Sequence, residues 1–186
     1  YEAVHRLIAQ AAPAPDTLVV LPEMFATGFS MNVPAVAEAP PGPTLKFVES
    51  MARQYKVCMV AGLVQYDDAG RPRNRCVAVG PDGSMLATYT KIKPAWIGPE
   101  GDHYPGGESV TRFSWLDSVI SPFICYDLRF PEVFRRAAAR WKPAVYTVIA
   151  CWPAARVHHW VRLLQARAIE NQAYVIGVNR AGRDPA

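Results

Sequence analysis

The stretch VISPFICYDLRFPE, residues 119–132, predicts a strand, a tight turn and the start of a helix. Its apolar first six residues are typical of a buried strand, and Pro131 followed by Glu132 is typical of a first helical turn. Cys125 falls on the connection, where we expect its side chain to be exposed. A cysteine inside a strand is an inert hydrophobic group, but one at the carboxyl end of a strand can be a nucleophile if a base and an electrostatic partner reach it.

The rest of the chain repeats this alternation of strands and helices. Helical patterns cover residues 1–11, 43–55, 131–141 and 155–172, and strand patterns cover residues 18–21, 57–65, 75–79, 85–89, 110–115, 119–124, 144–150 and 174–178. Residues 29–42 and 97–107 are expected to be irregular loops. Strands that are apolar on both faces, such as residues 57–62 and 145–150, indicate a sheet covered by further layers. We therefore expect one layered α/β (or α+β) domain over residues 1–186.

The composition excludes several classes of protein. With 186 residues, 51% of them hydrophobic and 19% charged, the chain has material for one sizeable core. The net charge of +4 is scattered, so nucleic-acid binding is not expected. Neither a membrane span nor a secretory signal is visible. The four cysteines lack disulfide or zinc spacing, which favours reduced thiols in the cytoplasm and no metal or cofactor.

Two further charged residues arrive at strand ends as Cys125 does. Glu23 follows the apolar run at residues 18–21, and Lys91 follows the strand pattern at residues 85–89. In open α/β sheets, ligands bind at the carboxyl ends of the strands, where loops converge on a rigid support. Each residue alone also has a structural interpretation: Glu23 as a helix-start carboxylate, Lys91 as a solvated charge and Cys125 as core. Their shared placement favours a common site.

Long motifs accompany these three residues. They are LPEMFATGF at residues 21–29, YTK at 89–91, CYDLRFP at 125–131, WPAAR at 152–156, ARAIENQAYV at 166–175 and VNR at 178–180. In this order and at these separations they resemble the nitrilase superfamily of carbon-nitrogen hydrolases. The wording is most similar to the omega-amidase branch, which hydrolyses the side amide of small dicarboxylic acid monoamides. The resemblance spans almost the whole chain.

The resemblance implies a four-layer α-β-β-α fold and a Glu-Lys-Cys triad of Glu23, Lys91 and Cys125. Glu100 matches a second glutamate that would orient Lys91 and the substrate, and the backbone amide of Tyr126 would help to hold the oxyanion. The family also implies a homodimer or a higher homo-oligomer. Residues 1–186 would form a single carbon-nitrogen hydrolase domain that is incomplete at both ends, without its first strand and its C-terminal strands; the turn at residues 182–186 leads to no further element.

Other family positions are interpreted as supporting ones. We expect Trp152 to form a wall of the substrate pocket and Asp127 to hold the turn through backbone hydrogen bonds. Arg129 and Glu170 are expected to pair beneath the site and to fix the turn that carries Cys125. His158 and His159 offer an alternative base for Cys125, but the resemblance assigns them no chemistry.

The sequence therefore favours a metal-independent thiol amidase that acts on a small amide with a carboxylate group. A nitrilase or an N-carbamoyl amide hydrolase would use the same triad. A catalytically silent member that serves as a binding or assembly module belongs to a different class and stays open at this point.

Overall fold

The computed structural model describes residues 1–96 and 98–182, so most of the predicted turn at residues 182–186 lies outside the described residues. The helices are α1 (Glu2–Ala11), α2 (Val33–Val36), α3 (Pro43–Tyr55), α4 (Glu100–His103), α5 (Pro131–Trp141) and α6 (Val157–Asn171), with 3-10 turns at Cys125–Arg129 and Ala154–Arg156. The strands are β1 (Leu18–Val20), β2 (Cys58–Tyr66), β3 (Pro72–Val79), β4 (Met85–Thr90), β5 (Phe113–Trp115), β6 (Ser118–Ile124), β7 (Val145–Ala150) and β8 (Tyr174–Asn179).

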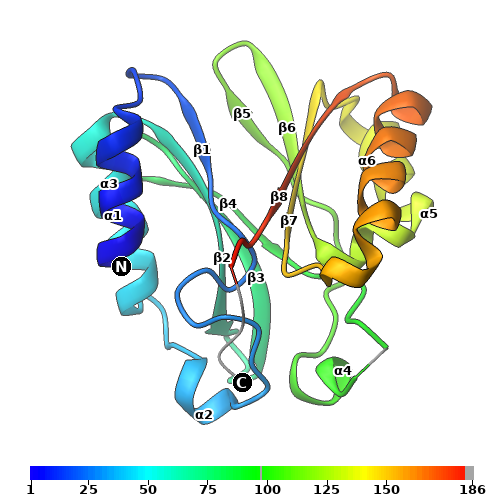
Figure 1. The fold of residues 1–186 in the computed structure, drawn as a ribbon, viewed down its shortest axis with the longest axis horizontal. Helices are drawn as coiled ribbons and strands as arrows, with labels where there is room; N and C mark the ends of the chain where they lie inside the picture. The colour runs from blue at the N-terminus through cyan, green and yellow to red at the C-terminus, as the bar shows by residue number, and fades with distance from the viewer. Residues whose placement is uncertain (97, 183–186) are drawn as a thin grey trace.

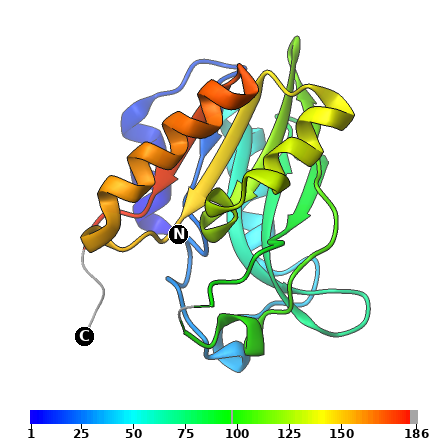
Figure 2. The ribbon, with the colours of Figure 1, turned by 90° about the vertical axis from the view of Figure 1, so that its right-hand side faces the viewer.

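The strands form two mixed four-stranded sheets, ordered β1-β2-β3-β4 and β5-β6-β7-β8. In the first sheet β1 and β2 are parallel, and β3 and β4 return antiparallel; in the second, β6, β7 and β8 are parallel and β5 is the antiparallel edge. The sheets lie face to face, with α1 and α3 outside the first and α5 and α6 outside the second (Figure 1). Figure 2 shows α5 and α6 crossing the outer face of the second sheet. The described residues thus form the four layers that the sequence predicted.

Two apolar cores hold the layers together. Alternate residues of β2 point to opposite cores: Cys58 and Val60 face the second sheet, and Met59 and Ala61 face α1 and α3. This is why residues 57–62 are apolar without alternation. On the far side Phe123 of β6 packs against Phe134 of α5, with ring centroids 4.2 Å apart.

The predicted helices and strands are all present, with boundaries that differ by at most three residues. The short helices α2 and α4 lie in segments that the sequence predicted to be irregular. Each has four residues and lacks a side-chain cap, so no periodic signal was long enough to predict it. No helix among residues 1–96 and 98–182 has the length and apolar character needed to cross a membrane.

The topology brings six strand ends to one edge of the molecule. The strands β1, β2, β4, β6, β7 and β8 all finish there, and β3 begins there, because β3 runs against its neighbours. Glu23, Lys91 and Cys125 follow three of these ends, so strands far apart in the sequence deliver them to the same place.

Candidate active site

Glu23 is held by the backbone of the neighbouring strand. Gly62 of β2 donates from its amide to Pro22 O and accepts from Phe25 N, both at 3.2 Å. A Cβ at Gly62 would lie 2.6 Å from the Cα of Glu23, so only glycine allows this approach. The Glu23 side chain is fully buried. Its Oε2 accepts from Cys151 N at 2.9 Å.

Lys91 lies between two carboxylates. Its Nζ donates to Glu23 Oε1 at 2.9 Å and to Glu100 Oε1 and Oε2 at 2.8 and 2.9 Å. All three side chains are at most 2% exposed. Burial alone would lower the pKa of Lys91, but the negative charges of Glu23 and Glu100 outweigh it and raise the pKa well above its usual value. Lys91 is therefore an ammonium at rest, and Glu23 is the better candidate for the base.

Glu100 reaches the site from the short helix α4. Its Oε2 also accepts from Ala95 N at 2.6 Å, which ties the carboxylate to the loop between Lys91 and α4. The structure thus brings Glu23, Lys91 and Glu100 together, as the sequence predicted.

Cys125 begins the 3-10 turn after β6 with a φ of 44°, in the left-handed region. The predicted exposure is wrong: the residue is only 8% exposed, since the sheets and the turn enclose it. It lines a cavity of about 650 Å³ together with Lys91. Burial first, and then the charge of Glu23, raise the pKa of the thiol, while Lys91 lowers it. At rest the sulfur is therefore a neutral thiol with a carboxylate next to it.

The turn itself offers a backbone donor. Tyr126 is the second residue of the 3-10 turn, and the first amides of a helical turn have no acceptor within it. They point away from the turn and carry the positive end of its dipole. This suits the predicted role of the Tyr126 amide towards an oxyanion.

Asp127 holds the turn in the way the sequence predicted. The fully buried carboxylate accepts from Tyr89 Oη at 2.8 Å and Ile124 N at 3.0 Å through Oδ2, and from Lys93 N at 2.9 Å through Oδ1. Burial raises its pKa to about 6, although these hydrogen bonds oppose the rise. Asp127 thus joins β4 and the segment after Lys91 to the strand that carries Cys125.

The predicted pair of Arg129 and Glu170 is not formed. Glu170 pairs with Arg167 instead, with Nη1 and Oε1 2.9 Å apart, because the two lie three residues apart on one face of α6. Arg167 is buried and donates through Nε and Nη2 to Leu128 O at 3.1 and 2.9 Å. Arg167 therefore fixes the turn through Leu128 O, and Glu170 is the ion-pair partner of Arg167.

Arg129 belongs to the wall of the cavity. Its guanidinium lies over the rings of Trp152 and Tyr126, at 4.8 and 5.6 Å from their centroids. Its Nη2 lies 3.4 Å from His159 Nδ1. The charged groups that shift the pKa of Cys125 are Glu23, Lys91 and Glu100, so the geometry gives no support to a histidine base.

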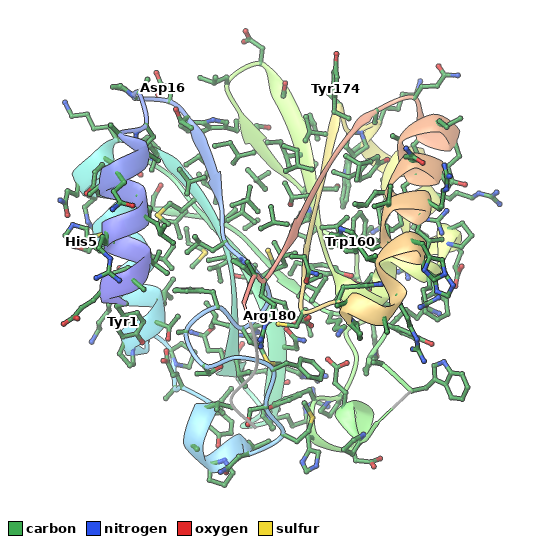
Figure 3. The ribbon with its side chains drawn as sticks, viewed as in Figure 1. Tyr1, His5, Asp16, Trp160, Tyr174 and Arg180 are labelled. Carbon is green, nitrogen blue, oxygen red and sulfur yellow. The ribbon has the colours of Figure 1, made fainter. Side chains whose placement is uncertain are left out.

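Trp152 lines the cavity as predicted and is clamped by Asn179. Trp152 N donates to Asn179 Oδ1 at 2.7 Å, and Asn179 Nδ2 donates to Trp152 O at 3.0 Å. The clamp joins the ends of β7 and β8. Arg180 follows β8 and lies in the middle of the molecule between the two halves, whereas Trp160 lies between the second sheet and α6 (Figure 3).

Sequence reasoning missed three residues that shape this site: Gly62, Asn74 and Phe29. Asn74 donates to both carboxylates, and Phe29 places its ring 5.7 Å from Lys91 Nζ. Phe29 lies in a motif that was noted, and the glycine in the apolar run at residues 57–64 was a signal for close backbone approach. Asn74 sits in the polar start of β3 and carried no comparable signal.

No group of three or more possible metal ligands gathers among residues 1–96 and 98–182. The four cysteines form no disulfide with one another, and Cys151 is half-buried whereas the other three are buried. The candidate site thus consists of a thiol, an ammonium and two carboxylates beside a cavity.

Comparisons with known proteins identify the family of this chain. The family model "Carbon-nitrogen hydrolase" matches residues 1–185. The omega-amidase YafV of Yersinia enterocolitica is 42% identical over 170 residues, which cover 90% of this chain and 63% of that protein. The 2-oxoglutaramate amidase of Bacillus subtilis is 31% identical over 90% of this chain and 65% of its own length. The chain thus spans less than two thirds of the length of these relatives.

Among solved structures, a CN-hydrolase superfamily protein of Xanthomonas campestris with an arsenic adduct in its active site superposes with a TM-score of 0.89 at 31% identity. The match covers 98% of this chain and 70% of that one. The fold and site define a carbon-nitrogen hydrolase architecture, and this chain belongs to the carbon-nitrogen hydrolase family of the nitrilase superfamily.

The raised pKa of Cys125 predicts how the resting thiol reacts. Because only the thiolate is alkylated, we expect the rate with iodoacetamide to rise about tenfold per pH unit from pH 7 to pH 9 without levelling. Mass spectrometry of the peptide that carries Cys125 measures this rate. In Glu23→Gln the raising charge is gone, so the rate at each pH should increase. A plateau below pH 8 in the parent chain would show a resting thiolate and contradict the prediction.

Proposed function

We propose that this protein hydrolyses the amide of a small carboxylate-bearing monoamide through a thioester on Cys125, with release of ammonia. The observation that carries the proposal is the buried Lys91 ammonium between Glu23 and Glu100, next to a neutral thiol at a cavity. The names of the relatives, omega-amidase and 2-oxoglutaramate amidase, support the same class of reaction.

In the first step Glu23 removes the proton of Cys125 as the sulfur attacks the amide carbon. The thiol is buried with a raised pKa, so a base must act during the attack. Glu23 is the carboxylate whose charge and hydrogen bond act on this thiol. The attack puts negative charge on the carbonyl oxygen, which Lys91 Nζ and the amide of Tyr126 would stabilise. One preorganised donor of this kind contributes about 3 to 4 kcal/mol.

In the second step protonated Glu23 gives its proton to the nitrogen that leaves. The carbon-nitrogen bond breaks, ammonia departs and an acyl thioester remains on Cys125. Glu23, again a carboxylate, then removes a proton from water, and the hydroxide attacks the thioester carbon. The carbon-sulfur bond breaks, the carboxylic acid is released, and the proton held by Glu23 returns to the sulfur.

Glu100 contributes by orientation. Its two oxygens hold Lys91 Nζ on the side away from Glu23, and Ala95 N fixes the carboxylate in turn. A second negative charge also keeps Lys91 protonated. We infer that Glu100 positions Lys91, and through it the substrate carbonyl.

The preference for a carboxylate rests on the cationic side of the cavity. Arg129, Arg156 and Arg180 line it together with the apolar side chains of Phe29, Trp152 and Val157. A guanidinium binds a carboxylate through two parallel hydrogen bonds, so such a wall suits a monoamide with a free acid group. A carboxylate-bearing nitrile or N-carbamoyl compound would use the same Cys125 and meet the same arginines, so a comparison of substrates separates the three.

Ammonia release from a panel of short monoamides tests the proposal. We expect Cys125→Ala to lose activity on the order of a thousandfold or more, and Glu23→Gln about 100- to 10,000-fold. Cys58→Ala, which removes a buried thiol of β2 away from the cavity, is the matched control and should retain activity. The proposal fails if no amide, nitrile or carbamoyl compound yields ammonia that depends on Cys125.

Arg129→Met should separate recognition of the carboxylate from chemistry. Because a charge-assisted contact contributes roughly 1.5 to 3 kcal/mol, we expect KM for a carboxylate-bearing monoamide to rise about 10- to 100-fold. A neutral amide of the same length should change by less than about threefold. Arg162→Met, on the exposed face of α6, serves as the control. An equal loss for both substrates would contradict a carboxylate-binding role.

A further inference from the structure

We propose that Asn74 is a positioning residue that holds both carboxylates of the site on Lys91. This inference rests on the proposed function, since it concerns the base and the oxyanion partner of that reaction. Asn74 lies near the start of β3, is 1% exposed and directs its amide group at Glu23 and Glu100. It therefore acts through these two residues.

The contacts of Asn74 close a ring. Its Nδ2 donates to Glu23 Oε1 at 2.7 Å and to Glu100 Oε1 at 3.0 Å. Lys91 Nζ donates to the same two oxygens, at 2.9 and 2.8 Å. Two donors and two acceptors thus alternate around the ring, and each acceptor oxygen is shared between an ammonium and an amide.

This arrangement answers an electrostatic problem. Two buried carboxylates surround one ammonium, so the site carries an excess negative charge, and the carboxylates repel each other in a medium that screens them poorly. Lys91 has three protons, which Glu23 Oε1 and both oxygens of Glu100 accept at rest, so one proton must turn from Glu100 to the substrate oxygen during the reaction. The two N–H groups of Asn74 hold the carboxylates together without adding charge, so Glu100 keeps a donor when Lys91 turns.

The orientation of the Asn74 amide follows from the same argument. Turning the amide over would put its oxygen against two carboxylate oxygens, which is repulsive. In the observed orientation Asn74 Oδ1 receives no hydrogen bond from any group of residues 1–96 and 98–182. The amide therefore leaves its own oxygen unpaired in order to direct both N–H groups at the carboxylates.

The backbone of the same segment anchors the other partners. Asn74 O accepts from Lys91 N at 3.0 Å, so one residue fixes Lys91 and both of its counter-charges. The preceding residue, Arg73, donates through Nη1 to Pro105 O and Gly106 O at 2.6 and 3.0 Å. These contacts hold the chain just after α4, which carries Glu100.

A consequence for the reaction concerns the two oxygens of Glu23. Oε1 accepts from Lys91 and Asn74, so both of its lone pairs are used. Among the described residues, Oε2 accepts one backbone hydrogen bond, from Cys151 N. Asn74 thereby leaves Oε2 as the oxygen that exchanges the proton with Cys125.

Two substitutions distinguish a donor from a packing group. Asn74→Leu keeps the branching at Cγ but removes both N–H donors, whereas Asn74→Ser retains one donor and leaves a small void. We expect kcat to fall about 100-fold in Asn74→Leu, the size of a misplacement of about 1 Å, and less in Asn74→Ser, with KM within about threefold of the parent. If Asn74 only filled space, Asn74→Leu would be the more active of the two.

A readout independent of the substrate is the apparent melting temperature in a double-mutant cycle with Glu100→Gln. Because Asn74 bridges two negative charges, its loss should matter less when one of them is neutral. The drop in melting temperature caused by Asn74→Leu is expected to be about half as large in the Glu100→Gln background. Gln65→Leu, which removes a buried amide of β2 that contacts Arg75 and neither carboxylate, is the matched control and should give additive shifts.

The outcomes separate this inference from the proposed function. If the parent chain releases no ammonia from any substrate, the proposed function fails and the melting cycle alone decides whether Asn74 bridges the carboxylates. Additive shifts for Asn74→Leu and Glu100→Gln would overturn the bridge. In an active parent, a kcat for Asn74→Leu within threefold of the parent value would overturn the positioning role even if the shifts are coupled.

Discussion

The rest of the site depends on one buried ammonium, Lys91, that is held by two carboxylates. A lysine removed from water is stable only if its charge is matched, and removing one partner of a buried pair costs about 3–5 kcal/mol because it leaves the other charge uncompensated. Glu23 and Glu100 provide that match at 2.8 to 2.9 Å. They also keep Lys91 protonated, while burial and then the charge of Glu23 keep the nearby Cys125 a thiol. In the resting cluster the ammonium and the carboxylates are therefore charged, and the nucleophile stays neutral until a substrate binds.

The packing of two sheets against each other makes this cluster possible. Glu23 and Lys91 come from the first sheet and Cys125 from the second, so the cluster spans the interface between two sheets whose facing sides are apolar. Three further contacts position the residues of the cluster. Gly62 allows the backbone at Glu23 to approach β2 closely, Asp127 joins β4 to β6, and Arg167 donates to the turn that carries Cys125. Burial raises the pKa of Asp127. In return its carboxylate binds the Tyr89 side chain and the backbone amides of Lys93 and Ile124, so it links three parts of the chain.

Much of the fold and the main chemical groups could be predicted from the sequence, because long apolar runs and helical periodicity are local signals. The motifs around Glu23, Lys91 and Cys125 named the residues that the structure brings together. What failed depended on tertiary geometry. Cys125 was expected to be exposed, but packing of the second sheet buries it. Arg129 was expected to pair with Glu170, but Glu170 pairs with Arg167, which lies three residues before it on α6. Asn74 was missed because a single polar residue at the start of a strand has no pattern that reveals its partners.

In the proposed reaction Cys125 carries the acyl group of the substrate as a thioester. Mass spectrometry of the protein after rapid mixing with a carboxylate-bearing monoamide and acid quenching within milliseconds detects this intermediate. We expect an adduct whose mass equals that of the substrate minus ammonia, located on the peptide that contains Cys125 and removed by hydroxylamine. An adduct on Cys151 instead, or ammonia release without any covalent adduct on Cys125 at any quench time, would contradict it.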